Sequence, residues 1–237
     1  MKYSAYPKYK PSGVEWLGDI PAHWEVKRLK YCATINDEAL AETTDPAFEF
    51  EYVDISSVDA VRGIVDSELV EFENAPSRAR RIARDGDTIV STVRTYLRAI
   101  APVRRQKENL IVSTGFAVVR PRSVDANFLS YALRESRFVE TVVAHSVGVS
   151  YPAVNPSDVA TIPIALPSET EQRAIAAFLD AETAKLDKLV GSKRSLVEDE
   201  RGGLFVQLLY CLAEYRRGLI TAAVTGKIDL RSVNQCR

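Results

Sequence analysis

Arginines, hydroxyl side chains and a tyrosine gather at residues 91–98, Ser-Thr-Val-Arg-Thr-Tyr-Leu-Arg. The β-branched residues that lead into this stretch predict a strand that runs into a polar loop. An arginine fork matches the O6 and N7 atoms of guanine, and hydroxyl and phenol groups suit phosphate contacts. The stretch therefore indicates DNA contact, although an exposed hairpin edge with arginines for solubility would have the same composition. The residues we assign to DNA contact here are Ser91, Thr92, Arg94, Thr95, Tyr96 and Arg98.

A second candidate segment for DNA contact is Ser-Val-Gly-Val-Ser-Tyr at residues 146–151. Its small residues would let the backbone approach a phosphate closely, whereas the alternative is a plain connector to Asn155. Arg78, Arg80, Arg81 and Arg84 either contact phosphate or neutralise the acidic segment before them, and the sequence leaves both open. To the DNA-contact set we add Ser146, Gly148, Ser150, Tyr151, Arg104 and Arg105.

The distribution of charge says more than its total, which is only −1 for 237 residues. Twelve acidic residues and one arginine lie between Asp37 and Glu73, followed by eight arginines against two aspartates between Arg78 and Arg105. Such polarity lets one face attract phosphate while another repels it, although both segments could also be solvated surface.

No pattern for catalysis, metal or cofactor binding is present. The sequence lacks a phosphate-binding GxxxxGK[ST] loop, a GxGxxG turn and an HExxH motif, and it has two histidines. Asn155-Pro156-Ser157-Asp158 faintly resembles the Asn-Pro-Pro-aromatic motif of amino-methyltransferases, but it lacks the second proline and the aromatic ring. We therefore expect Asn155 to cap a short helix and the chain to be no enzyme and to bind no cofactor.

Three scattered cysteines without a CxxC pair argue against a disulfide framework and against a zinc site. No apolar run approaches the roughly 20 residues of a membrane span, and the N-terminus lacks the apolar core of a signal peptide. We expect a soluble, cytoplasmic protein without membrane contact.

Residues 1–166 are expected to form one mixed, mostly β domain. Residues 48–55 alternate apolar and charged side chains, which predicts a half-buried strand, and residues 110–119 are a second β-rich run with a possible bulge at Gly115. Helices are expected from Asp125 or Asn127 and over 138–144. Residues 167–237 would follow as a long-helix, coiled-coil-like region, so the fold class is α+β.

The helical region opens with Ser168 and Glu171, whose spacing predicts a capping box. Gly202 and Gly203 cost about 2 kcal/mol relative to two alanines, so we expect a kink or break there. An unbroken helix over 168–220 would span about 80 Å, and its apolar stripe would need a partner helix; an ordinary amphipathic helix packed on its own domain is the alternative. The residues assigned to the partner face are Ile175, Phe178, Leu179, Leu186, Leu189, Leu196, Leu204, Leu208 and Tyr215.

Three stretches carry a resemblance to a known family. These stretches are PSETEQRAIAAFLDAETAKLDKL, EYRRGLITAAVTGKIDLR and, near the N-terminus, YKPSGVEWLGDIPAHWEVKRL. All three resemble the specificity subunit of type I restriction-modification systems. Members of that family usually carry two target-recognition domains and two helical regions, and this chain has room for one of each.

The resemblance implies a DNA-specificity module. Residues 1–166 would be the target-recognition domain, and 167–237 the conserved region for dimerisation and methyltransferase docking. Partner subunits would carry the chemistry: a methyltransferase with S-adenosylmethionine modifies adenine, and an ATP-dependent restriction subunit acts through it. With one domain and one helical region, a homodimer reading a palindromic, two-part site in double-stranded DNA is expected.

Two other readings stay open. A truncated scaffold that no longer reads DNA would still bind the methyltransferase or a full-length specificity subunit. An enzyme that acts alone is the third reading, and no motif supports it.

Overall fold

The computed structural model describes residues 3–104, 109–194 and 202–231, and for 192–194 and 202–205 it describes the backbone alone. The chain divides into two compact units, one of Val26–Ile164 and one that joins Met1–Glu25 to Ala165–Arg237. The expected domain boundary at residues 166 and 167 lies close to the second crossing between the units. Residues 1–25, expected in the recognition domain, group with the helices instead.

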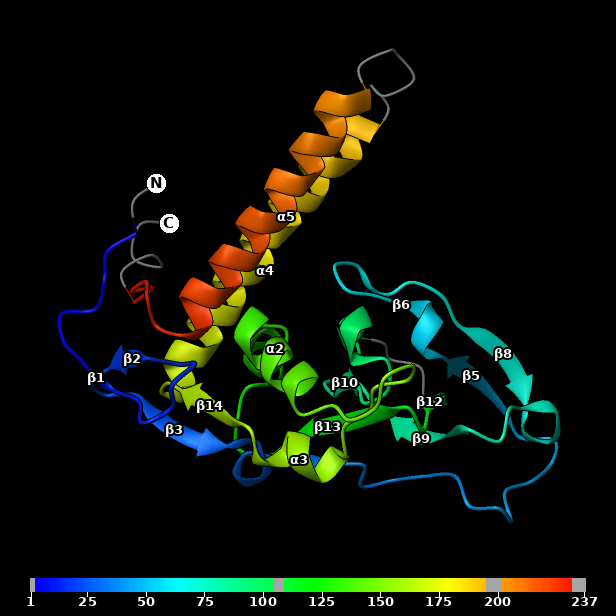
Figure 1. Cartoon of the computed structure of the whole chain (residues 1–237). Coiled ribbons are helices and arrows are strands. Elements are labelled where there is room, and N and C mark those ends of the chain that lie inside the picture. The colour runs from blue at the N-terminus through cyan, green and yellow to red at the C-terminus, as the bar shows by residue number, and fades with distance from the viewer. Residues whose placement is uncertain (1–2, 105–108, 195–201, 232–237) are drawn as a thin grey trace. The chain divides into compact units, whose positions relative to one another are not determined.

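The unit of residues 26–164 contains two four-stranded sheets (Figure 1). The first has the order β11-β10-β13-β4, is antiparallel throughout, and comprises Ile100–Pro102, Thr88–Ser91, Phe116–Pro121 and Ala33–Ile35. The second has the order β8-β5-β12-β9, with β5 and β12 parallel, and comprises Glu68–Glu71, Glu49–Val53, Leu110–Ser113 and Ala79–Ala83.

One apolar core joins the two sheets. Val53 and Val112 reach it from the second sheet, and Ile89 and Phe116 from the first. The other face of the second sheet buries Phe50 and Tyr52 in a separate cluster, while Glu49 before them is exposed and Glu51 between them is half-buried. The alternation in residues 48–55 therefore predicted this strand and its buried face correctly.

The predicted β run over 110–119 is two strands and not one. Thr114 and Gly115 form a turn between β12 and β13, which belong to different sheets. Gly115 thus lies in the turn and not in a bulge. Apolar β-branched residues on both sides hide this turn in the sequence, because both strands are buried on both faces.

Short elements complete this unit. The helices are α1 (Ala126–Leu133), α2 (Ser136–Ala144) and α3 (Pro156–Thr161), and β6 (Val58–Asp59) pairs with β7 (Gly63–Ile64). The 3-10 helices are η1 (Leu29–Tyr31), η2 (Ile55–Ser57), η3 (Phe72–Asn74) and η4 (Thr95–Leu97). Asp125 caps α1 by accepting a hydrogen bond from the Phe128 N–H, and Asn155 occupies the N-cap of α3, as expected.

The unit of residues 1–25 and 165–237 is built on two long helices, α4 (Glu169–Arg194) and α5 (Gly202–Val224), which pack side by side and antiparallel (Figure 1). β1 (Tyr9–Pro11) pairs with β2 (Asp19–Pro21), and the chain passes between the units within β3 (Glu25–Arg28) and β14 (Pro163–Leu166). The helical region is thus no unbroken rod of about 80 Å: α4 ends at Arg194 and α5 begins at Gly202, the position where a kink or break was expected. At 1.5 Å per residue the two helices are about 39 and 35 Å long.

Contacts between α4 and α5 explain why the chain folds back. Leu179 and Leu186 on α4 and Ala223 on α5 are buried. The Arg216 guanidinium donates to the Thr183 carbonyl at 3.2 Å and to the Asp187 carboxylate at 2.6 Å. The apolar stripe that was expected to need a second molecule is thus partly covered by the chain's own second helix.

Candidate nucleic-acid interface

The two segments expected to contact DNA lie together in the unit of residues 26–164. We call residues 91–98 the arginine loop and residues 146–151 the small-residue loop. The Arg94 N–H donates to the Pro152 carbonyl at 2.8 Å, and the Thr95 and Ser146 hydroxyls are 2.7 Å apart. Val147 and Ala153 exchange backbone hydrogen bonds of 2.8 and 3.0 Å, which close the small-residue loop. Segments about fifty residues apart in the chain therefore form one surface.

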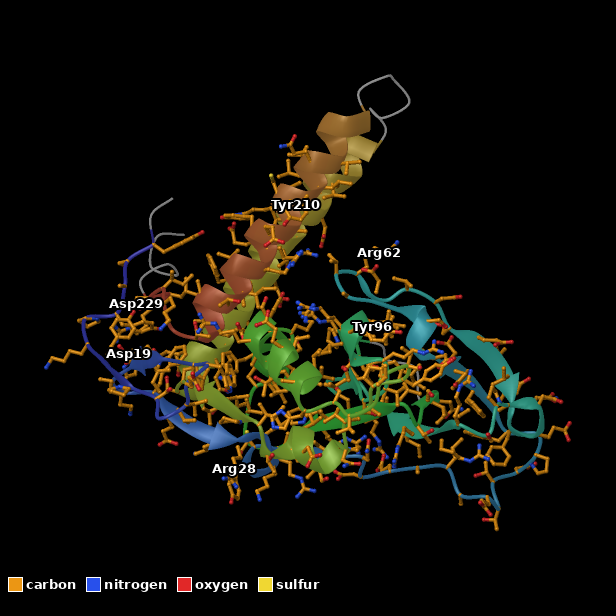
Figure 2. All side chains as sticks on the ribbon, viewed as in Figure 1. Asp19, Arg28, Arg62, Tyr96, Tyr210 and Asp229 are labelled. Atoms are coloured by element: carbon orange, nitrogen blue, oxygen red, sulfur yellow. The ribbon has the colours of Figure 1, made fainter. Side chains whose placement is uncertain are left out.

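The arginine loop has an unusual backbone. Arg94 and Arg98 flank η4, and both adopt the left-handed conformation, with φ of 50° and 54°. This region costs a non-glycine residue about 1–3 kcal/mol and is concentrated at functional sites. The conformation holds the intervening turn so that Tyr96 and Leu97 are exposed, and Figure 2 labels Tyr96 on this turn.

The predicted DNA-contact residues of this loop fall into two groups. Ser91, Thr92 and Thr95 are buried, and the Ser91 and Thr92 hydroxyls donate to the carbonyls of Val93 and Gly115. These three residues hold the loop in place. The exposed or half-exposed members are Arg94, Tyr96 and Arg98.

Arg94 has an aromatic neighbour and Arg98 has an acidic one. The Arg94 guanidinium carbon lies 5.0 Å from the centroid of the Tyr151 ring, a cation–π contact. The Arg98 guanidinium is 3.8 Å from the Glu140 carboxylate, and both side chains are well exposed. Arg94 is thus stacked on the other loop, whereas the ion pair of Arg98 with Glu140 is long and exposed to solvent.

The small-residue loop is open to solvent. Gly148, Ser150 and Tyr151 are exposed, Val149 is fully exposed, and Ser146 is half-buried beneath them. Of the remaining expected DNA contacts, Arg104 is exposed and Arg105 lies outside the described residues.

A pocket of about 480 Å³ opens beside both loops. The Arg78 guanidinium donates from Nη2 to the Asp54 carboxylate at 2.7 Å and from Nε to the Tyr52 hydroxyl at 3.1 Å. The hydrogen bond to Asp54 makes the largest contribution and the one to Tyr52 the next, and together they raise the pKa of Arg78 above its ordinary value. The side chain therefore stays charged. The polar residues that line the pocket include Asp54, Ser56, Arg78, Arg94, Thr114 and Tyr151.

Gly115 makes the close packing beneath this pocket possible. A Cβ atom at this position would lie 2.8 Å from Ile55 Cδ1 and 2.9 Å from Val93 Cγ2. A side chain here would push η2 and the arginine loop apart.

The sequence pointed to the arginines and Tyr151 but missed Asp54, Ser56 and Thr114. The sequence did place Asp54 directly after the alternating strand, which could have marked it as a candidate site residue. Thr114 gave no such signal, because the turn that contains it is hidden between two β-rich runs. The structure also bears on the arginines left open: Arg78 pairs with Asp54, and Arg84 makes two bonds of 2.8 Å to Glu38. Both neutralise residues of the preceding acidic segment.

Within the described residues, no group of three or more histidine, cysteine, aspartate or glutamate side chains could hold a metal ion. None of the described helices combines the length and hydropathy that a membrane crossing requires. The two arginines and the hydroxyl side chains that line the pocket suit a polar or anionic ligand.

Comparison with known proteins assigns the family. The model of the type I restriction modification DNA specificity domain matches residues 21–197, which is most of the chain. The chain belongs to this family. The match includes residues 26–164 with both candidate DNA loops and, from the other unit, residues 21–25 and 165–197. The family resemblance drawn from short stretches is confirmed.

Solved structures from the same family agree. The HsdS subunit from Thermoanaerobacter tengcongensis is 34% identical over 76% of this chain and 47% of that chain, with a TM-score of 0.64. A chain from a study of complex assembly and conformational transition of the type I R-M system is 33% identical over 83% of this chain and 50% of that chain, with a TM-score of 0.67. This specificity-family chain thus spans about half the length of both. No curated protein sequence matches it.

The residues expected on the partner face divide between covered and exposed positions. Ile175, Leu179 and Leu186 are buried, and Phe178 is half-buried with its ring edge-to-face on Tyr3. Leu196 lies outside the described residues, as does the side chain of Leu204. The exposed members, with 40–51% of their surface accessible, are Leu189, Leu208 and Tyr215.

Proposed function

We propose that this chain is the DNA-reading subunit of a type I restriction-modification complex, in a half-length form. The observation that carries the proposal is the joining of the arginine loop and the small-residue loop into one exposed surface. That surface offers Arg94 and Arg98 as forks for base edges or phosphate, and Tyr96, Ser150 and Tyr151 for backbone contacts. In this proposal, residues 26–164 are the part that reads the duplex.

The chemistry belongs to partners in this proposal. Methyltransferase subunits that use S-adenosylmethionine would modify adenine at the site that this chain selects. An ATP-dependent restriction subunit would act through them on unmodified DNA. The helical unit is the proposed docking element, because its exposed apolar residues need a covering surface.

We further propose that two copies act together. The chain spans about half the length of its solved relatives, so two copies supply what one relative contains. The exposed side chains Leu189, Leu208 and Tyr215 are the proposed contact, and Val206 and Tyr210 on α5 are exposed beside them in sequence. A two-fold pair would read a palindromic site in two parts, with an unread gap between them.

DNA binding in increasing salt tests the central claim. With the methyltransferase present, wild-type protein is expected to prefer its own site over scrambled duplex by at least about a thousand-fold, and its affinity should fall as salt rises. Arg94→Ala should reduce the preference by about 5- to 150-fold. Equal binding to site and scrambled duplex by the wild type would refute the proposal.

A scaffold without DNA reading is the second candidate. It is favoured by one observation: α4 and α5 cover part of the stripe that was expected to recruit a second copy. Such a chain would bind the methyltransferase or a full-length specificity subunit with the same affinity whether or not DNA is present.

A further inference from the structure

Arg78 is held by two bonds that lie on one edge of its guanidinium group. Nε donates to the Tyr52 hydroxyl and Nη2 to the Asp54 carboxylate, so this side edge is occupied. The end edge, with one N–H each from Nη1 and Nη2, makes no bond within the described part of the chain. That edge is the fork that matches guanine O6 and N7.

The two residues that hold Arg78 are more buried than the arginine itself. Tyr52 is 5% exposed and Asp54 has 26% of its side chain accessible, whereas the Arg78 side chain is 55% exposed. Asp54 is fixed in turn, because its other oxygen accepts the Ile55 N–H at 2.7 Å. An exposed ion pair contributes at most about 1 kcal/mol to stability, so stability alone gives little reason for this arrangement.

Arg78 also lines the same pocket as Arg94 and Tyr151. Arg94 is positioned by stacking and Arg78 by hydrogen bonds, so both guanidinium groups are preorganised on one concave surface. A fixed fork loses less side-chain freedom on binding than a mobile one, which favours base reading over loose phosphate contact.

We propose that Arg78 is a further base-reading residue, which recognises guanine, and that Asp54 and Tyr52 are its positioning residues. This inference rests on the proposed function and adds a specificity determinant outside both predicted loops. Arg78 donates two hydrogen bonds from its end edge to O6 and N7 of one guanine. Asp54 touches no base and acts by aiming Arg78.

The test compares Arg78→Ala, Arg78→Lys and Asp54→Asn with Arg84→Ala as the matched control. Arg84 is also an exposed arginine bonded to a carboxylate, but it does not line the pocket. The full chain with its methyltransferase is incubated with a randomised duplex library, and the bound or methylated sequences are read. Thermal melting of each variant shows that it is folded.

Wild type is expected to require guanine at one position that Arg78→Ala relaxes, with discrimination there reduced about 10- to 100-fold. Arg78→Lys should keep phosphate attraction but lose the same discrimination, because an ammonium has no fork. Asp54→Asn should relax that same position by a smaller factor, while Arg84→Ala leaves the motif unchanged.

Two results would overturn the inference alone. Either the Arg78→Ala motif equals the wild-type motif while Arg94→Ala changes it, or Arg78→Ala weakens all sequences equally, as a phosphate contact would. A wild type without any sequence preference would overturn both this inference and the proposed function.

Discussion

Arg94 connects the two loops at the scale of a single residue. Its backbone N–H donates a hydrogen bond to the Pro152 carbonyl, its φ is positive, and its guanidinium lies over the Tyr151 ring. The backbone bond fixes where the side chain begins, and the ring fixes where it ends. In the proposed function, an arginine side chain held at both ends would present its guanidinium group to a base edge in one orientation, which is what discrimination between bases requires.

Tyr151 should therefore matter through its ring. We expect Tyr151→Leu to reduce the preference for the target site by about 2- to 5-fold, since an exposed cation–π contact is worth about 0.5–1 kcal/mol. Tyr151→Phe should retain most of that preference because it keeps the ring. The measurement is the ratio of dissociation constants for target and scrambled duplex at one salt concentration. If the leucine and phenylalanine variants behave alike, Arg94 does not depend on this stacking.

Gly115 offers a prediction about stability. A methyl group here would meet Ile55 and Val93 at less than 3.0 Å, so Gly115→Ala should lower the free energy of unfolding by about 1–3 kcal/mol. The matched control is Gly191→Ala on α4, where a Cβ meets nothing within 4 Å; this change should stabilise the helix by up to about 1 kcal/mol. Urea unfolding of the three proteins measures both effects. An unchanged or higher free energy for Gly115→Ala would contradict the tight packing under the pocket.

At the scale of elements, the start of α4 gathers the three stretches that first suggested the family. Glu171 accepts hydrogen bonds from His23 Nε2 at 2.9 Å and from the Ser168 hydroxyl at 2.8 Å. Near the other end of the chain, the Gly226 carbonyl accepts a hydrogen bond from the Tyr9 hydroxyl at 3.0 Å. The N-terminal stretch, the capping box and the C-terminal stretch therefore meet in one unit, and their joint resemblance has a structural cause.

Glu171 makes this junction sensitive to acid. Burial acts to raise the pKa of Glu171, but hydrogen bonds from His23, Ser168 and Trp24 outweigh burial and hold the pKa below its usual value. A carboxyl group whose pKa is lower in the folded state adds stability above its unfolded pKa. That stability disappears as the pH falls through the folded pKa.

We expect Glu171→Gln to cost about 1–3 kcal/mol near pH 7 and to flatten the loss of stability below pH 5, because a neutral amide cannot replace the ionised acceptor. Glu169→Gln is the control: it lies in the same first turn of α4, but its side chain is 71% exposed and pairs with Arg173. Urea unfolding from pH 3 to 7 measures both variants. Equal pH profiles for wild type and Glu171→Gln would contradict this role.

The sequence predicted single elements better than their pairing. Alternation at 48–55 and the Asp125 cap depend on neighbouring residues, and both are present. The Ser168–Glu171 box is present in part: the Ser168 hydroxyl accepts the Glu171 N–H at 3.4 Å, but the Glu171 carboxylate accepts from the Ser168 hydroxyl and not from its backbone N–H. The turn at Gly115 and the return of α5 along α4 depend on contacts between distant residues, which periodicity does not record. An apolar stripe is the same whether its partner helix belongs to the same chain or to another.

The DNA surface was predicted in part for the same reason. Arg94 and Tyr151 were assigned from residue type, but their contact across the two loops was not, and Asp54 was missed because its role depends on Arg78. Residue type also could not show that Thr92 and Thr95 of the arginine loop are buried whereas Tyr96 of the same loop is exposed.

At the scale of the whole molecule, the proposed function requires two reading units. A type I site has two separated parts in the proposed function, and residues 26–164 supply a single reading unit. One copy would therefore read one part. Pairing of two copies supplies the other part without any new contact to DNA, and it raises affinity through two linked binding events.

Substitutions on the exposed surface of α4 and α5 are expected to prevent two copies of the chain from associating. Leu208→Glu with Leu189→Glu places two charges on side chains that are 40% and 49% exposed, so the fold of one copy should survive. A dimer that buries these leucines should dissociate, because each unpaired buried charge costs several kcal/mol. Leu69→Glu on β8 is the matched control: the same change at a leucine that is 68% exposed in the other unit. Light scattering at micromolar concentration, alone and with the methyltransferase, should show a dimer for wild type and Leu69→Glu and a monomer for the double variant. A wild type that stays monomeric in both conditions would remove pairing from the proposed function and leave the scaffold as the better account, since a monomer could read only half of a two-part site.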